Sequence, residues 1–218
     1  MGASVEFLPS KNFLGRTDFM TKPWMKKKPN NLQKKYPRKS FCIFTEGDTE
    51  ELYFKDFNLS NVKAHSLKGG GLVPMMEKLK KYRNGAFAGY NFYWLVFDMD
   101  NKFEKDIQTL ILDVKQNKYS FCFSNPCFEI WYLLHYDYRE TAITSSDAIN
   151  SLGRKIQKYS KTMPGIYDIL KRKQETAIKN SQKLFPLEKR RNLTFKGIPN
   201  PSTNIDNLVQ QLNKFISK

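Results

Sequence analysis

Apolar and polar positions follow two alternating patterns between residues 40 and 136. Short runs rich in β-branched and aromatic residues predict strands, and these runs lie at 40–45, 61–67, 91–98 and 119–124. After each run, apolar residues recur at helical spacing, which predicts helices within 48–57, 69–85, 104–117 and 125–136. Strands that alternate with helices in this way are typical of an α/β fold with a mostly parallel sheet and helices on both of its faces.

The pattern changes after this region. Residues 145–187 are helical in pattern and rich in Lys and Arg, and NPSTNIDNLVQQLNKFIS (200–217) predicts a terminal helix that begins near Ser202 or Thr203. Near the N-terminus, by contrast, prolines interrupt a basic stretch that has no periodicity. We therefore expect three parts, which are a basic, flexible N-terminal arm at 1–39, an α/β core at 40–140 and a basic helical extension at 141–218 whose last helix packs back on the core.

The composition is that of a globular protein with one sizeable core, because 40% of the 218 residues are hydrophobic and 14% are aromatic. The apolar runs are too short to span a membrane, and the first residues lack the features of a secretory signal. We therefore expect a cytoplasmic protein without a membrane partner. Cys42, Cys122 and Cys127 lie in apolar surroundings without a CxxC spacing, so we expect buried thiols rather than disulfides or zinc ligands.

Positive charge is concentrated in two segments of a chain whose formal net charge is +16. Residues 1–40 hold ten basic and two acidic residues, so 10 − 2 = +8, and residues 150–196 hold thirteen and three, so 13 − 3 = +10. Either segment alone is consistent with a solvated surface. Two basic segments that flank an acidic centre favour a nucleic-acid partner, because Lys and Arg neutralise phosphates. An anionic membrane is the competing partner, but no helix with a Trp and Leu face and no lipidation motif supports it.

Acidic residues gather where the predicted strands end. Glu46 and Glu50 follow the first strand, Asp98 and Asp100 follow the third, and Glu129 follows the fourth. Ligands of an open α/β sheet bind in the crevice outside the carboxyl ends of its strands. The Asp-x-Asp spacing directs two of these side chains to the same side of an extended chain. We therefore expect these carboxylates to converge.

Carboxylates that converge repel one another unless a cation compensates for their charge. Hard oxygen ligands without a His or Cys cluster favour Mg²⁺ or Mn²⁺ over zinc, and His65 and His135 are the only histidines in the chain. Lys68, beside a glycine turn, and Lys102, just past the Asp-x-Asp, are the nearest candidates for holding a substrate phosphate. We expect Asp48 to cap the helix after the first strand rather than to bind a metal.

Four motifs resemble those of one protein family, in the same order. They are TEGDTEELYF (45–54), FDMDN (97–101), FSNPCFEIWYLLHY (123–136) and NPSTN (200–204), and together they look like the successive motifs of RloB-like proteins. A first strand that ends in Glu-Gly and a later strand that ends in Asp-x-Asp also resemble the Toprim domain of topoisomerases, primases and OLD nucleases. The resemblance spans about residues 41–216.

The resemblance implies a Toprim-like Rossmannoid core with a nuclease-type centre. On this basis the predicted catalytic residues are Glu46, Asp98, Asp100 and Glu129, and the same four residues together with Glu50 would bind Mg²⁺ or Mn²⁺. Ser124 and Asn125 lie beside Glu129 in the sequence and could orient a ligand or a water. With Lys68 and Lys102 they form the predicted substrate-binding set.

The favoured hypothesis is a metal-dependent nuclease that cleaves DNA or RNA, with tRNA as one attractive target. The resemblance further implies an effector of an anti-phage abortive-infection system that works with a separate ATPase subunit, since the chain itself has no Walker motif. The alternative is a non-catalytic Toprim-like scaffold that binds nucleic acid or docks that ATPase. A primase-type activity is the third hypothesis, but no primase zinc module accompanies it.

Overall fold

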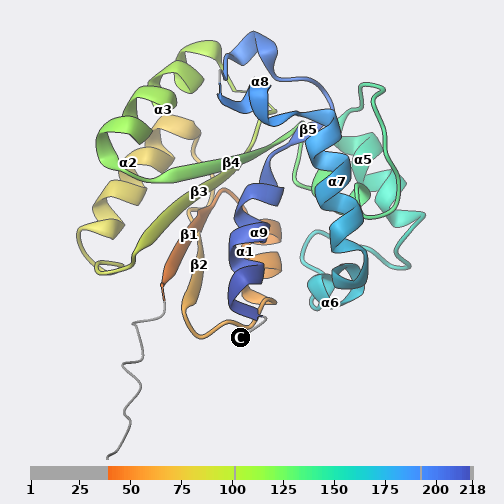
Figure 1. Ribbon diagram of the computed structural model, residues 1–218, viewed down its shortest axis with the longest axis horizontal. Helices are drawn as coiled ribbons and strands as arrows, with labels where there is room; N and C mark the ends of the chain where they lie inside the picture. The colour runs from red at the N-terminus through yellow and green to blue at the C-terminus, as the bar shows by residue number, and fades with distance from the viewer. Residues whose placement is uncertain (1–38, 101, 192, 217–218) are drawn as a thin grey trace, which may run out of the picture. The chain divides into compact units, whose positions relative to one another are not determined.

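Five strands form a single sheet in the residues that the computed structural model describes, which are 39–100, 102–191 and 193–216. The strands are β1 (Phe41–Thr45), β2 (Val62–Ser66), β3 (Phe92–Asp98), β4 (Ser120–Asn125) and β5 (Ser202–Thr203). Their order is β2-β1-β3-β4-β5, with the first four parallel and β5 antiparallel to β4 (Figure 1). The predicted α/β class with a mostly parallel sheet is therefore confirmed. The predicted arm at 1–39 lies outside the described residues except for Lys39.

Side chains along each strand alternate between the two faces of the sheet, because successive Cβ atoms point in opposite directions. In β1, Phe41 and Ile43 enter one hydrophobic cluster, whereas Cys42 and Phe44 enter the other. All four side chains are almost completely buried. A strand that is buried on both faces must be apolar at nearly every position, which is why β1 and β3 are continuous apolar runs in the sequence.

Helices cover both faces of this sheet. They are α1 (Asp48–Lys55), α2 (Leu72–Arg83), α3 (Glu104–Asn117), α4 (Glu129–Leu133), α5 (Ser145–Gly153), α6 (Ile166–Leu170), α7 (Gln174–Leu184), α8 (Leu187–Arg191) and α9 (Ile205–Ile216), with short 3-10 turns at Lys171–Lys173 and Phe195–Gly197. The α2 and α3 helices cover one face, while α1, α4, α5, α6, α7 and α9 contribute to the cluster on the other (Figure 1). Within the described ranges, no helix has both the length and the apolar content that crossing a membrane requires.

The terminal helix α9 is joined to the sheet through β5. Its fully buried apolar side chains have the i, i+3, i+4, i+7 spacing of one helix face, and they are Ile205, Leu208, Val209 and Leu212. Just before α9, the Asn204 side chain accepts a hydrogen bond from the backbone N–H of Phe123 at 2.7 Å, and Thr203 Oγ1 donates to Phe123 O at 2.8 Å. These two bonds hold the segment before α9 along β4.

Two helices begin later than the sequence pattern predicts. α9 begins at Ile205 rather than near Ser202, because Ser202 and Thr203 first pair with β4. α4 begins at Glu129 rather than at Pro126, so the buried acid is the first residue of the helix. Before α9 the chain pairs with β4, and before α4 the carbonyl oxygen of Pro126 accepts a hydrogen bond from the backbone N–H of Asp100.

The predicted cap of α1 is wrong. Gly47 occupies the N-cap position and no side chain caps this helix, whereas Asp48 Oδ1 accepts a hydrogen bond from Lys68 Nζ at 2.6 Å. The Lys68 ammonium group, from the loop after β2, thus binds the Asp48 carboxylate, which was expected to accept a hydrogen bond from a backbone N–H at the start of α1. The expectation for the cysteines is confirmed, since all three are free and buried.

Candidate functional site

The sheet has a topological switch point between β1 and β3. From β1 the chain passes to β2 on one side, whereas β3 lies on the other side and leads on to β4. At such a point the connections leave the carboxyl ends of neighbouring strands in opposite directions, and the crevice between them is where α/β proteins bind ligands. Glu46 directly follows β1 and Asp98 is the last residue of β3, so both stand at this crevice.

Glu46 links the carboxyl ends of β1 and β3 through hydrogen bonds. Its Oε2 atom accepts a hydrogen bond from the backbone N–H of Asp98 at 3.1 Å. Both carboxylate oxygens also accept hydrogen bonds from Lys102 Nζ, at 2.9 and 3.1 Å. Because the Lys102 side chain is only 7% exposed, this ion pair is shielded from water and its attraction is stronger than that of a surface pair. Glu46 is thus in direct contact with two other predicted site residues, Asp98 and Lys102.

Glu50 reaches the same crevice from the first turn of α1. Its side chain is buried, and burial, together with the negative charges of Glu46 and Glu129, raises the pKa of its carboxyl group from 4.5 to about 7. A Cβ atom at residue 47 would lie 3.0 Å from Glu50 Oε2. The glycine after β1 therefore leaves room for the buried carboxylate, which a larger residue would displace slightly.

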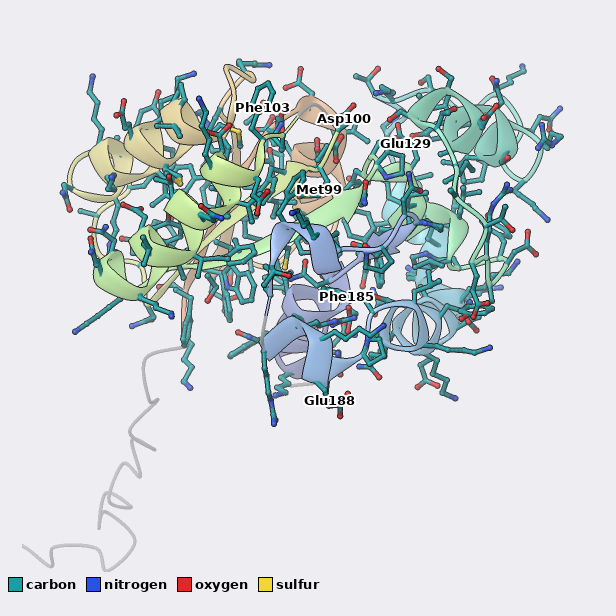
Figure 2. All side chains as sticks on the ribbon, turned by 90° about the horizontal axis from the view of Figure 1, so that it is seen from above. Met99, Asp100, Phe103, Glu129, Phe185 and Glu188 are labelled. Carbon is teal, nitrogen blue, oxygen red and sulfur yellow. The ribbon has the colours of Figure 1, made fainter. Side chains whose placement is uncertain are left out.

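Asp98 is the acid of the crevice with the fewest compensating contacts. Its Oδ1 atom is buried without a hydrogen-bond partner among the described residues. Burial first, and then the neighbouring carboxylates with Glu50 and Glu129 foremost, hold the pKa of Asp98 well above its usual value of 3.8. The backbone N–H of Asp100 donates to Pro126 O at 3.2 Å, which holds the loop after β3 beside the loop after β4. Figure 2 shows Asp100 and Glu129 in this region.

Glu129, the first residue of α4, is almost completely buried. Its Oε1 atom accepts a hydrogen bond from the Tyr159 hydroxyl at 3.1 Å and lies 3.9 Å from Lys161 Nζ. Burial and the adjacent Glu129 raise the pKa of the Tyr159 hydroxyl, which therefore stays protonated as a donor. No sequence pattern pointed to these two residues, since they belong to a basic stretch and Tyr159 is 30 positions from Glu129 along the chain.

Lys68 lies at the edge of the crevice, in the glycine turn after β2. It is exposed and its Nζ atom pairs with Asp48, as described above. Gly69, Gly70 and Gly71 all have positive φ values, of 68°, 101° and 83°, which only glycine adopts readily. The backbone N–H of Gly69 donates to the carbonyl oxygen of Glu46 at 2.9 Å, so the turn lies directly against the residue that follows β1.

The side chains of Ser124 and Asn125 have partners within the protein. Ser124 is buried and its Oγ atom lies 2.9 Å from Thr203 Oγ1, while Asn125 Nδ2 donates to Pro199 O at 2.9 Å. Both contacts attach β4 to the segment around β5. The predicted contact of these two residues with a substrate stays a prediction.

The residues of the crevice suit a hard divalent cation in type. Glu46, Glu50, Asp98 and Glu129 offer only carboxylate oxygens, the ligands that Mg²⁺ and Mn²⁺ prefer. A cation would offset the repulsion among these acids and would bind Oδ1 of Asp98, for which the described residues provide no partner. In the described parts of the chain, no three acidic, His or Cys side chains are already arranged as a metal site. Donor chemistry and burial therefore fit a metal ion, although the ligand arrangement is not preformed.

A comparison with protein families gives a match over most of the chain. The family model described as RloB-like protein matches residues 41–212. The match begins with β1 and ends within α9, so it covers the whole sheet and every acid of the crevice. No curated protein and no solved structure matches the chain.

Proposed function

Since the chain belongs to the RloB-like protein family, we propose that it is a Mg²⁺- or Mn²⁺-dependent nuclease with a Toprim-like core. Its substrates are phosphodiesters of RNA, tRNA included, or of DNA. It acts in the cytoplasm as the effector of an anti-phage abortive-infection system, and a separate ATPase subunit is its partner. The basic helical part from residue 141 onward adds contacts to the nucleic-acid backbone.

The observation that carries this proposal is that Oδ1 of Asp98 is buried without a hydrogen-bond partner among the residues that the structure describes. Buried acceptors are normally satisfied, because an unmet one costs about 1–3 kcal/mol, and more when it is charged. Here the neighbouring carboxylates Glu50, Glu129 and Glu46 add repulsion instead. Groups perturbed in this way gather at functional sites, and a bound cation is the use that these residue types support best.

In the proposed centre the metal ligands are Glu46, Glu50, Asp98, Asp100 and Glu129. When bound, the ion polarises the phosphodiester, lowers the pKa of an attacking water and stabilises the leaving oxygen. The protein's own groups orient the carboxylates: the Tyr159 hydroxyl holds Glu129 and the Lys102 ammonium holds Glu46. Lys102 also places a positive charge at the crevice, where it can pair with a substrate phosphate.

An exposed aromatic residue beside the crevice supports a nucleic-acid substrate. Phe103 is 65% exposed at the N-cap of α3, three positions after Asp100. Figure 2 shows both residues in the same region, and Lys105 Nζ lies 5.9 Å from the centroid of the Phe103 ring. Nucleobases stack on exposed rings and lysines pair with phosphates, so this rim offers both kinds of contact.

Asp98→Asn and Glu46→Gln test the centre. Each change keeps the shape of the side chain and removes one negative charge, so the variants should fold but lose metal-dependent cleavage. The purified proteins are incubated with labelled RNA and DNA panels in Mg²⁺, Mn²⁺ or EDTA, with and without a candidate ATPase partner. We expect the wild type to cleave when metal is present, and both variants to show only the background seen in EDTA.

Glu104→Gln is the matched control. Glu104 is an exposed acid in the first turn of α3, so this change removes the same charge near the crevice without altering the buried acids. It should cleave as the wild type does. Full cleavage by Asp98→Asn in the same metal titration would contradict the proposal.

A non-catalytic scaffold is the second candidate, and the lack of a preformed metal arrangement among the described residues favours it. Glu129→Gln separates the two, because it keeps an acceptor for Tyr159 but removes a carboxylate ligand. If the protein is a nuclease, Mn²⁺ should raise the Tm of the wild type. Glu129→Gln should show little of that increase and should not cleave, but it should still bind an ATPase. For the scaffold, Mn²⁺ should leave both Tm values unchanged and no substrate should be cleaved.

A further inference from the structure

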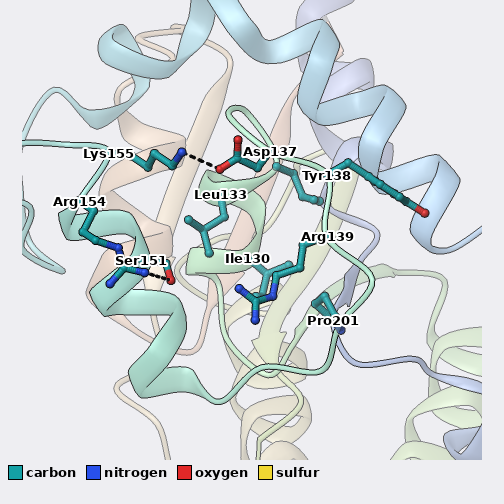
Figure 3. A pocket seen from close by; sticks show the side chains of 10 residues that line it. Ile130, Leu133, Asp137, Tyr138, Arg139, Ser151, Arg154, Lys155 and Pro201 are labelled. Carbon is teal, nitrogen blue, oxygen red and sulfur yellow. Dashed lines mark hydrogen bonds and ion pairs between the residues drawn. The ribbon is translucent and has the colours of Figure 1, made fainter.

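A second candidate ligand site lies on another face of α4. A pocket of about 350 Å³ is enclosed between α4, the loop that follows it, the C-terminal end of α5 and Pro201 (Figure 3). Its aliphatic wall consists of Ile130, Leu133, Leu134 and Pro201. Glu129 is not among its lining residues, so the pocket is separate from the acidic crevice although the same helix contributes to both.

Positive charge dominates the polar part of this pocket. The carboxylate of Asp137 is neutralised by Lys155, whose Nζ lies 2.7 Å from Oδ2. Two further cations line the pocket, Arg139 from the loop after α4 and Arg154 from the end of α5, and they approach the same space from opposite sides (Figure 3). Neither forms an ion pair with a carboxylate of the described residues. The pocket therefore has a net positive charge that no described acid cancels.

Each of these two arginines keeps most of its donors for a ligand. Arg139 Nε donates to Thr141 O at 3.2 Å, and Arg154 Nη2 donates to Ser151 Oγ at 2.9 Å. A guanidinium group has five N–H donors, so one bond of this kind orients the group and leaves the others available. Planar forks of this type match the oxygens of a phosphate group.

The walls of the pocket are held by specific hydrogen bonds. The backbone N–H of Ile143 donates to Asn200 Oδ1 and Asn200 Nδ2 donates to Ile143 O, both at 3.1 Å, so the loop after α4 is fixed to the segment that carries Pro201. Thr144 caps α5, since its Oγ1 accepts from the backbone N–H of Asp147 at 3.1 Å. The pocket is thus part of the folded framework, as small-molecule sites generally are.

We propose that this pocket binds a nucleotide, with the base against the aliphatic wall and the phosphate between Arg139 and Arg154. Its volume lies near the lower end of the range of about 300–1,000 Å³ in which proteins bind small molecules. An inorganic anion would leave the aliphatic wall uncovered, and a neutral apolar ligand would leave two guanidinium groups unmatched. A ligand with a flat, largely apolar body and one anionic group covers the aliphatic wall and also pairs with the two guanidinium groups. The proposal goes beyond the nuclease function and does not depend on it.

Isothermal titration of the purified full chain in EDTA tests the proposal, with AMP, GMP, CMP and UMP as probes. EDTA separates this pocket from the acidic crevice, where binding of a nucleotide phosphate would need a metal ion. Inorganic phosphate and uncharged adenosine are the two comparison ligands. We expect at least one monophosphate to bind, and phosphate and adenosine to bind about tenfold or more weakly, since each lacks one half of the contacts.

Three variants localise the binding. Arg139→Ala and Arg154→Ala should each weaken binding about tenfold, because each removes a charged hydrogen-bond donor. Both side chains are exposed, so both variants should fold. Arg172→Ala, which removes the same charge from an exposed position outside the pocket, should bind as the wild type does. The proposal is overturned if no monophosphate binds in EDTA, if phosphate alone binds as tightly, or if the Arg139→Ala/Arg154→Ala double variant keeps wild-type affinity.

Discussion

Two buried acids of this protein have opposite surroundings. Asp206 is completely buried, and its carboxylate oxygens accept hydrogen bonds from Arg190 Nη1 at 2.9 and 3.0 Å. Oδ1 of Asp98 is buried too, but it has no partner in the described part of the chain. A buried charge is tolerated only when partner groups compensate for its lost hydration. The two acids thus differ in that Asp206 is compensated by an arginine, whereas the described residues offer Oδ1 of Asp98 no compensating contact.

A third buried group, His135, predicts how the stability of the fold depends on pH. Its Nδ1 atom lies 2.9 Å from Trp131 O, and burial lowers the pKa of the ring from 6.5 to about 4. The folded state therefore prefers the neutral imidazole. This contribution to stability is fully present above pH 6.5 and is lost as the pH falls from 6.5 towards 4. On account of His135, the free energy of unfolding should fall by about 2 kcal/mol between pH 8 and pH 5.

Urea unfolding of the wild type and of His135→Asn at these two pH values measures this contribution. Asparagine keeps a donor near Trp131 O but does not titrate, so the difference between the two proteins isolates the imidazole from the carboxylates that titrate in the same range. The wild type should lose about 2 kcal/mol more than the variant on acidification. Equal losses in the two proteins would show that the fold does not select the neutral ring.

At the scale of elements, long regular patterns could be predicted and short segments could not. The helix expected at 104–117 coincides with α3, because its 14 residues repeat the helical spacing over several turns. β1 and β3 could be recognised because both of their faces are buried. β5 has two residues, too few for any periodicity, and it exists because Thr203 and Asn204 form hydrogen bonds with β4.

The candidate site, too, could be predicted only in part. The position of Glu46 and Asp98 follows from parallel strands, since the carboxyl ends of such strands share one edge of the sheet. The contacts of Tyr159 and Lys161 with Glu129 depend instead on the path of the chain between α5 and α6, where no pattern indicates direction. The ion pair between Lys102 and Glu46 could not be read from the sequence either, because Lys residues are frequent throughout the chain.

One side chain connects four elements of the C-terminal region. Arg190 of α8 bonds to Asp206 of α9, and its Nη2 atom donates to Ser181 O of α7 at 3.1 Å and to Thr203 O of β5 at 3.4 Å. Arg190→Ala should lower the free energy of unfolding by about 3–5 kcal/mol, because Asp206 would remain buried without its partner. Arg190→Lys should recover little of this, since an ammonium group cannot reproduce the planar fork.

Arg191→Ala is the matched control for this prediction. Arg191 is the next residue of the same helix but is exposed, so its removal should change the free energy of unfolding by no more than about 0.5 kcal/mol. Urea or thermal unfolding of the three variants checks both statements. Similar losses for Arg190→Ala and Arg191→Ala would mean that the bonds of Arg190 do not hold these elements together.

At the scale of the whole molecule, a chain of formal net charge +16 contains a crevice lined by acids. If the basic segment 150–196 binds nucleic acid, the logarithm of the affinity should fall linearly with the logarithm of the salt concentration. Lys189→Ala/Arg191→Ala, which removes two exposed charges from α8, should reduce that slope by up to about 1.8 on B-DNA or about 1.4 on a single strand. Fluorescence anisotropy in EDTA measures the slope without cleavage.

Lys81→Ala is the control for the loss of a positive charge outside the proposed binding segment. Lys81 is exposed at the end of α2, outside both basic segments, so its removal should leave the slope unchanged. An affinity that stays constant from low to high salt would return the segment 150–196 to the role of a solvated surface.

The junction of β4 with β5 can form only late in translation, because its two sides are far apart in the sequence. Ser124 and Thr203 lie 79 positions apart in the chain, although their hydroxyl oxygens are 2.9 Å apart in the fold. At about 5–20 residues per second, a ribosome needs roughly 4–16 s to pass from one codon to the other. From residue 129 onward the nascent chain contains every acid of the crevice, but β5 cannot pair with β4 until residue 203 has been made. If the protein is the nuclease proposed above and its centre requires this pairing, the enzyme becomes active only after residue 203 has emerged, and its own messenger and ribosome are spared while it is being made.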